Sequence, residues 1–274
     1  MSTEKTEKEL AYLHDLFVAP DWDERFASLI DDHVKLPKEG HIVYLGAGTG
    51  GHAITIKQRG GDKLALLGFD ENRERVELAK AKATLAKEMV EFEHSTLESL
   101  PVADNHSDLV IGNASLVSVE RLKDVVADMV RVAKPGATVV LALATASSFA
   151  EFFSVYWEAL HNLGFIDHEG DVEKLITEAP TVSDAEDLVQ NQGLDDVTSM
   201  TQLEEFDFDS GESFLRAPLI ADFLLKSWLS SLREDQRSAV SREVARIIND
   251  DRHDAEFALT VKATLIVGRK GRPN

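Results

Sequence analysis

Short apolar runs alternate with amphipathic stretches through the first half of the chain. From the apolar runs we predict five strands, at residues 42–45, 64–69, 90–93, 109–112 and 138–144. From apolar side chains at helical spacing we predict three helices between them, at residues 51–58, 73–87 and 121–133. Short buried strands that alternate with amphipathic helices are typical of a parallel sheet covered on both faces. The pattern therefore predicts an α/β fold.

The N-terminal 38 residues precede this alternation and predict two helices. The first carries Leu10, Leu13 and Phe17 at helical spacing and is expected to end before Pro20. The second begins near Trp22. Because these helices come before the first strand, we expect them to form a cap and to lie outside the repeating β-α units.

The regular alternation of strands and helices ends near residue 145. The region that follows predicts a long strand at 197–208 and a final strand at 256–267, in which every second residue is apolar. Between these strands, the stretches 214–232 and 234–249 read as helices, with Pro218 inside the first. The insertion between the last two strands is therefore predicted to be helical.

No low-complexity linker divides the chain, so we predict a single domain over residues 1–274. Its expected parts are an N-terminal helical cap at 1–38, an α/β core at 39–209 and 255–270, and a helical insertion at 210–254.

Charge and composition exclude several kinds of partner. The chain has 29 Lys+Arg against 49 Asp+Glu, a formal net charge of −20. Because this charge repels a phosphate backbone, we expect no nucleic-acid partner. The absence of cysteine excludes disulfides, thiolate metal ligands and a thiol nucleophile. The nine histidines show no metal-binding pattern, so we expect no metal.

The sequence also lacks the features of a membrane protein. The longest uncharged stretch, residues 135–150, is shorter than the ~20 apolar residues that a membrane span needs. The N-terminus is too charged for a signal peptide. We therefore expect no membrane partner and a cytoplasmic location.

The turn after the first strand carries the most chemical information. Gly46, Gly48 and Gly51 satisfy the spacing G-x-G-x-x-G, and Asp70 follows at the end of the second strand. Glycines allow a tight turn and let a ligand approach backbone N–H groups at the positive end of a helix. A carboxylate at the end of the second strand can accept hydrogen bonds from both ribose hydroxyls. Strand, glycines, helix and acid together predict a nucleoside-binding site.

Five segments in order resemble the class I S-adenosylmethionine-dependent methyltransferases, specifically the group that acts on small molecules. They are the first motif at 43–50, the second-strand acid at 67–70, the adenine-side loop at 96–101, the fourth strand at 107–113 and the turn at 131–136. The resemblance implies a Rossmann-like, doubly wound sheet of seven strands. The last strand is expected to be antiparallel and to lie between strands five and six.

The resemblance also implies S-adenosyl-L-methionine as the cofactor and a set of residues that bind it. On the matching positions these are Tyr44, Gly46, Ala47, Gly48, Gly50, Asp70, Glu71, Thr96, Leu97 and Asn113. Two of them depart from the family. Tyr44 stands where the family usually has an acid that helps hold the amino group of the methionine part. Thr96 stands where the family often has Asp, and Glu98 could substitute for that missing carboxylate.

We expect the substrate site to be formed by the N-terminal cap and by aromatic residues that follow the fifth strand or lie in the insertion. The candidates for substrate binding are His14, Phe153, Trp157, Phe223 and Trp228. The alternative is that these aromatic side chains simply bury the added helices. As a set they favour an apolar or aromatic acceptor.

The resulting hypothesis is methyl transfer to a small molecule by in-line displacement. Because the sulfonium cofactor is already activated, positioning can drive the reaction without a general base, and no catalytic residue is assigned. Two alternatives stay open. One is a cofactor-binding regulatory module without turnover, and the other is an NAD-dependent oxidoreductase. The oligomeric state is also open, with a dimer as one option.

Overall fold

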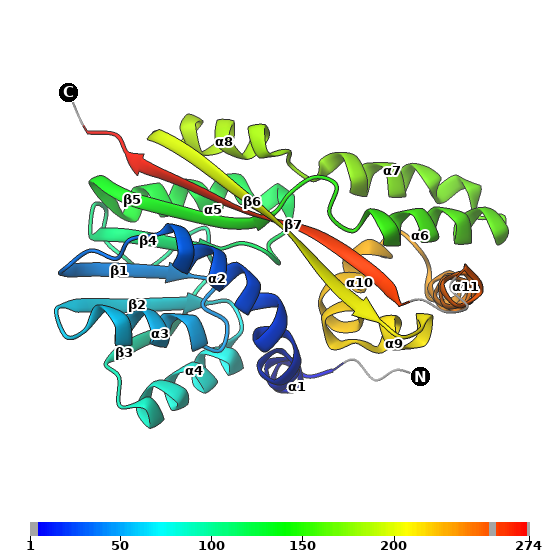
Figure 1. Ribbon diagram of the computed structural model, residues 1–274, viewed down its shortest axis with the longest axis horizontal. Helices are drawn as coiled ribbons and strands as arrows, with labels where there is room; N and C mark the ends of the chain where they lie inside the picture. The colour runs from blue at the N-terminus through cyan, green and yellow to red at the C-terminus, as the bar shows by residue number, and fades with distance from the viewer. Residues whose placement is uncertain (1–4, 252–255, 273–274) are drawn as a thin grey trace. The chain divides into compact units, whose positions relative to one another are not determined.

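The computed structural model describes residues 5–251 and 256–272, and it contains a seven-stranded mixed sheet (Figure 1). The strand order is β3-β2-β1-β4-β5-β7-β6. The strands are β1 (Gly40–Leu45), β2 (Leu64–Asp70), β3 (Val90–His94), β4 (Ser107–Asn113), β5 (Ala133–Ala144), β6 (Leu194–Phe208) and β7 (Phe257–Lys270). Strands β3, β2, β1, β4 and β5 pair in parallel, whereas β7 is antiparallel and lies between β5 and β6. The predicted fold class and the place of the last strand are confirmed.

Helices connect and flank these strands. They are α1 (Glu7–Leu13), the π-helical η1 (His14–Asp23), α2 (Glu24–His33), α3 (Gly51–Gly60), α4 (Arg73–Ala86), α5 (Val119–Val132), α6 (Ala150–Asn162), the 3₁₀ turn η2 (Ile166–His168), α7 (Glu169–Glu178), α8 (Val182–Asn191), α9 (Gly211–Arg216), the π-helical η3 (Leu219–Leu224), α10 (Leu225–Trp228) and α11 (Glu234–Asp251). The predicted helices of the β-α repeat correspond to α3, α4 and α5. Helix α7 was not predicted.

The chain divides into two compact units. Unit 1 comprises residues 1–143, 182–201 and 263–274, and unit 2 comprises residues 144–181 and 202–262. Two of the boundaries fall inside β6 and β7, so one part of each of these strands belongs to unit 1 and the other part to unit 2. The expectation of one domain over 1–274 stays a prediction.

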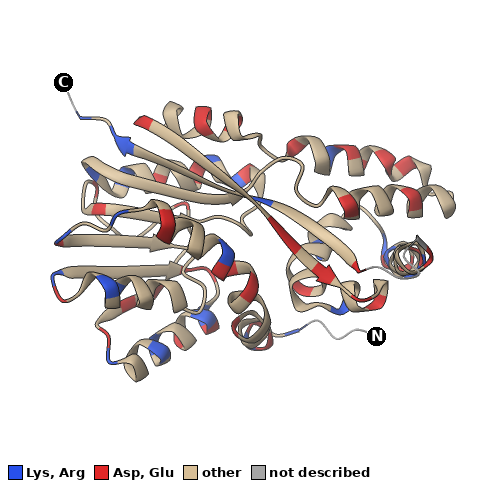
Figure 2. Ribbon diagram, viewed as in Figure 1, with Lys and Arg blue, Asp and Glu red and all other residues tan. Residues whose placement is uncertain are grey.

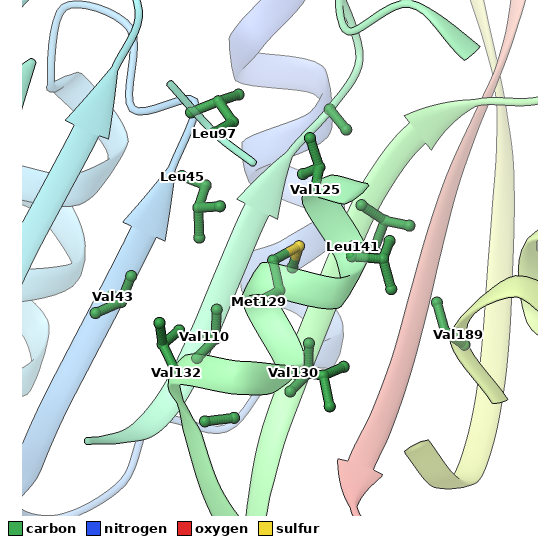
Figure 3. Packing of buried hydrophobic residues seen from close by; sticks show 14 of the residues in the cluster. Val43, Leu45, Leu97, Val110, Val125, Met129, Val130, Val132, Leu141 and Val189 are labelled. Atoms are coloured by element: carbon green, nitrogen blue, oxygen red, sulfur yellow. The ribbon is translucent and has the colours of Figure 1, made fainter. Parts of the chain in front are cut away.

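The core of unit 1 is formed where α5 covers β1, β4 and β5. Figure 3 shows Val125, Met129 and Val130 of α5 beside Val110 and Leu141 of the sheet. All five side chains are buried. The apolar face of α5 is therefore buried against the apolar strands, as the periodicity of both predicts.

Two predictions at prolines are wrong, namely the end of the first helix before Pro20 and the unbroken helix over 214–232 that contains Pro218. Pro20 does not end the first helix. Helix α1 continues directly into the π-helical η1, and Pro20 lies within η1. Pro218 does interrupt the predicted helix at 214–232. Since proline disfavours helical backbone in the residue before it, Ala217 is extended, with ψ 128°, and α9 ends at Arg216.

Acidic side chains are spread widely over the described part of the chain. Figure 2 shows acidic positions on many elements, α7, α8 and β6 among them. None of the described helices combines the length and the apolar character needed to span a bilayer.

Candidate functional site

The glycine turn follows β1 and adopts backbone that only glycine tolerates easily. Gly46 and Gly48 have φ of 65° and 55°, in the left-handed region. A Cβ on Gly46 would lie 2.3 Å from the backbone oxygen of Asn113, and one on Gly48 would lie 3.0 Å from Cε1 of His14. The turn is therefore closely packed against β4 on one side and against the N-terminal segment on the other.

Asp70 is buried at the end of β2 and organises this turn. Its Oδ2 accepts a hydrogen bond from the backbone N–H of Gly48 (2.9 Å), and its Oδ1 accepts one from Asn72 (2.9 Å). The guanidinium Nε of Arg75 lies 3.2 Å from Oδ1. A carboxylate has about four acceptor sites, so Oδ2 retains one for a ligand hydroxyl. Asn72, and not Asp70, caps α4, because its side chain accepts from the N–H of Arg75.

A pocket lies beside this carboxylate and brings together residues from distant parts of unit 1. Its lining comprises His14, Asp23, Gly46, Gly48, Asp70, Glu71, Arg75, Leu97, Asn113, Ser115, Leu116 and Val117. Six of the predicted cofactor residues belong to this lining, namely Gly46, Gly48, Asp70, Glu71, Leu97 and Asn113. Tyr44, Ala47, Gly50 and Thr96 do not. Asp23, Arg75 and Ser115 line the pocket and were not expected from sequence.

Tyr44 is buried in β1 and directs its hydroxyl to another residue. The hydroxyl oxygen lies 2.9 Å from Nδ1 of His52, and Nε2 of His52 lies 3.1 Å from Oδ1 of Asp31. Burial raises the pKa of the Tyr44 phenol, so it stays neutral. The side chain thus belongs to a hydrogen-bonded chain that runs towards α2.

The adenine-side loop presents a buried apolar residue and an ion pair. Leu97 is buried and lines the pocket, whereas Thr96 is exposed. Arg121 at the start of α5 pairs with both Glu98 and Glu71, and these hydrogen bonds raise the pKa of its guanidinium. Glu98, which the sequence suggested as a substitute for the missing acid of this loop, is therefore engaged with Arg121.

Two hydrogen bonds and an ion pair hold the N-terminal segment beside the pocket. The indole N–H of Trp22 donates to Oγ of Ser115 (2.9 Å), in the loop after β4. The hydroxyl of Thr49 donates to Oδ1 of Asp15 (2.5 Å), and Lys82 of α4 pairs with the same carboxylate. These hydrogen bonds hold the segment against the glycine turn.

The π-helical winding of η1 decides which side chains face the pocket. Nε2 of His14 lies 3.3 Å from Oδ2 of Asp23, nine positions further along the chain. In an α-helix of about 3.6 residues per turn, positions nine apart lie on opposite faces. The wider turn of a π-helix, with hydrogen bonds from residue i to i+5, brings them to one face. Sequence reasoning missed Asp23 because it assumed α-helical spacing and an end before Pro20.

Burial suppresses charge on both members of this pair. Desolvation lowers the pKa of His14 to about 3, so the imidazole is neutral at physiological pH. Desolvation also raises the pKa of Asp23 to about 7. Asp23 therefore changes its protonation close to neutral pH.

The aromatic candidates for substrate binding lie in unit 2, where Phe153 and Trp228 belong to a cluster of packed rings. Trp228 stacks on Phe152 with ring centroids 4.4 Å apart, and it also contacts Phe153. Phe153 and Trp228 are buried, Phe223 is half-buried and Trp157 is exposed. Within the described residues, no group of acidic or histidine side chains is arranged to hold a metal ion.

Comparisons with known proteins agree with this geometry. Residues 43–141 match the family model of a methyltransferase domain. The chain is 32% identical over 119 residues to norajmaline N-methyltransferase of Rauvolfia serpentina, covering 43% of this chain and 39% of that protein's length. It is 29% identical to demethylmenaquinone methyltransferase of Renibacterium salmoninarum, covering 58% and 68% of the two chains. The solved structure of YcgJ from Bacillus subtilis has the same fold, with a TM-score of 0.60, 17% identity and coverage of 91% and 100%.

The pocket residues fit the cofactor of that family. Gly46 and Gly48 line the pocket without side chains, Asp70 retains an acceptor site for a ribose hydroxyl, and Leu97 offers an apolar wall. The matched segment spans less than half of the chain, and together with the strand order and the pocket it makes the chain similar to the class I S-adenosyl-L-methionine-dependent methyltransferases.

Proposed function

We propose that this protein transfers a methyl group from S-adenosyl-L-methionine to a small molecule with an apolar or aromatic acceptor. The observation that carries the proposal is the pocket in which the glycine turn, the Asp70 carboxylate, Leu97 and Asn113 converge. This combination of bare backbone, acid and apolar wall suits a nucleoside that carries an amino-acid part.

Each pocket residue has a proposed role in holding the cofactor. Gly46 and Gly48 give the ligand access to backbone, and Asp70 accepts a hydrogen bond from the ribose. Glu71 and Leu97 flank the adenine, and Asn113 borders the methionine part. The roles of Tyr44, Ala47, Gly50 and Thr96 rest on the sequence motif alone.

The bound cofactor supplies an activated methyl group, so the protein's task is to position the acceptor and exclude water. The hydrogen bonds of Asp15 and Trp22 keep the N-terminal segment over the glycine turn. We propose that this segment shields the reacting centre, with His14 nearest to the acceptor. No proton acceptor is assigned, because in-line transfer to a nucleophilic acceptor does not require one.

The names of relatives support a small acceptor without fixing its atom. One relative is named for an N-methyl transfer to norajmaline, and another for methylation of demethylmenaquinone. Both named acceptors contain rings, which supports an aromatic or apolar acceptor here. Among the aromatic candidates, we propose Trp157 and Phe223, which are not buried, as residues that meet the acceptor, whereas Phe153 and Trp228 belong to the packed cluster.

The test is an incubation with S-adenosyl-L-methionine and a panel of ring-containing acceptors that offer carbon, nitrogen or oxygen nucleophiles. We expect one acceptor to gain the mass of a methylene group, with formation of an equal amount of S-adenosylhomocysteine. Gly48→Val, which fills the turn, is the control and should abolish both signals. A wild-type protein that binds the cofactor but yields no product across the panel would contradict the proposal.

A further inference from the structure

The pocket contains three carboxylates, and they differ in their partners. Asp70 pairs with Arg75, and Glu71 pairs with Arg121. Within residues 5–251 and 256–272, Asp23 is the pocket carboxylate with no Lys or Arg partner, and its contact is the neutral imidazole of His14 at 3.3 Å. A largely buried carboxylate of this kind is stabilised by any cation that a ligand brings to it.

The position of the usual acid in the first motif is occupied by a residue that cannot replace it. Tyr44 is neutral, and its hydroxyl is committed to His52. The amino group of the methionine part therefore lacks its usual anionic partner on β1. Asp23 is close enough to Tyr44 for its negative charge to raise the pKa of the phenol further. A carboxylate is thus present in the same neighbourhood, but it comes from η1.

We infer that Asp23 is the residue that binds the cofactor's ammonium group, in place of the acid missing from β1. His14 acts as the positioning residue. When its Nε2 carries the proton, it donates to Oδ2 of Asp23 and leaves Oδ1 for the ligand. The π-helical winding of η1 is what brings this pair onto one face, above Gly48. The inference rests on cofactor binding and not on methyl transfer.

Binding of a cation at this carboxylate must be linked to pH. Without ligand, the pKa of Asp23 is about 7. Burial is the main cause of this rise, the positive charges of Arg75 and Lys82 on α4 oppose it, and the negative charge of Asp70 on β2 adds to it. The ammonium group binds the ionised form, so Asp23 must lose its proton when the ligand enters. Affinity should therefore rise with pH up to about 7 and then level off.

The experiment compares two ligands by calorimetry at pH 8. S-adenosylhomocysteine carries the amino-acid part, and 5′-methylthioadenosine has the same nucleoside and thioether without it. For Asp23→Asn we expect affinity for S-adenosylhomocysteine to fall about 10- to 100-fold and affinity for methylthioadenosine to change less than about twofold. Asp21→Asn is the matched control, because Asp21 is exposed on the same helix and pairs with Arg25. It should bind both ligands like the wild type.

Several results would overturn the inference. Equal losses for both ligands would place Asp23 at the ribose or show general damage, and no loss would remove it from the site. Titrations at pH 6 and pH 8 add an independent readout: S-adenosylhomocysteine should bind the wild type up to about tenfold more weakly at pH 6, whereas Asp23→Asn should show no such difference. A wild type that binds neither ligand would refute the cofactor assignment as well.

Discussion

The pocket of unit 1 and the aromatic cluster of unit 2 are both rich in residues that can recognise a ligand, but they are built in opposite ways. In the pocket, acidic side chains such as Asp23 and Asp70 line a hollow. In the cluster, Phe152 and Tyr156 are fully buried and stack on each other, and Phe152 also stacks on Trp228. Aromatic rings in contact satisfy one another, whereas a carboxylate facing a hollow does not. Polar groups with unused hydrogen-bonding capacity therefore mark the ligand site more clearly than aromatic content does.

The largest effect should come from opening the aromatic cluster. Trp228→Ala removes a buried ring, so we expect the free energy of unfolding to fall by about 3–5 kcal/mol. Because the proposed cofactor residues lie in unit 1, affinity for S-adenosylhomocysteine should change less than about threefold. Denaturant unfolding and calorimetry measure the two quantities.

The control for this variant is Trp157→Ala, on α6 but 40% exposed, which should cost less than about 0.5 kcal/mol. If Trp228→Ala retained wild-type stability, the cluster would not be a packed core, and its rings would be available to an acceptor.

Filling the glycine turn should have the next largest effect, confined to the pocket. Gly48→Val places a branched side chain against His14, on backbone that disfavours it. We expect at least about a 100-fold loss of affinity for S-adenosylhomocysteine, or about 2.7 kcal/mol. Gly51→Ala is the matched control, since a Cβ there meets no atom within 4 Å. Wild-type binding by Gly48→Val in a folded protein would mean that the turn is structural only.

Removing the carboxylate of Asp70 should have a smaller effect. Asp70→Ala leaves a ribose hydroxyl and the N–H of Gly48 without an acceptor, so affinity for S-adenosylhomocysteine should fall by about 1–3 kcal/mol. Asp62→Ala, at an exposed site before β2, controls for the lost charge. Unchanged calorimetric affinity in Asp70→Ala would remove this residue from the cofactor site.

The smallest effect is expected at Tyr44, and it tests whether this side chain belongs to the pocket or to the core. Tyr44→Phe breaks the hydrogen bond to His52, so we expect the free energy of unfolding to fall by about 0.5–1.5 kcal/mol. Affinity for S-adenosylhomocysteine should change less than about twofold, because Asp23 and not Tyr44 is proposed to meet the ammonium group. The opposite result, weaker binding at unchanged stability, would return Tyr44 to the cofactor site.

The fold and the residues at the centre of the pocket could be predicted from local sequence patterns. Local patterns suffice for both, because strand and helix periodicity reflects which face is buried, and the glycine turn and Asp70 occupy fixed places in a β-α-β unit. Gly46, Gly48, Asp70, Glu71, Leu97 and Asn113 line one pocket as a result. The same patterns did not predict α7 or the break at Ala217 in the predicted helix at 214–232.

The polar groups that complete the pocket and the aromatic residues that form the core of unit 2 depend on packing between separate elements. Asp23 reaches the pocket through π-helical winding, which a pattern based on 3.6 residues per turn places on the wrong face. Phe152 and Trp228 are far apart in sequence, and their contact depends on how α6 and α10 pack. The hydroxyl of Tyr44 belongs to His52 because α3 brings that imidazole to β1. Each of these depends on contacts between separate elements, and the spacing of residues along a chain does not specify them.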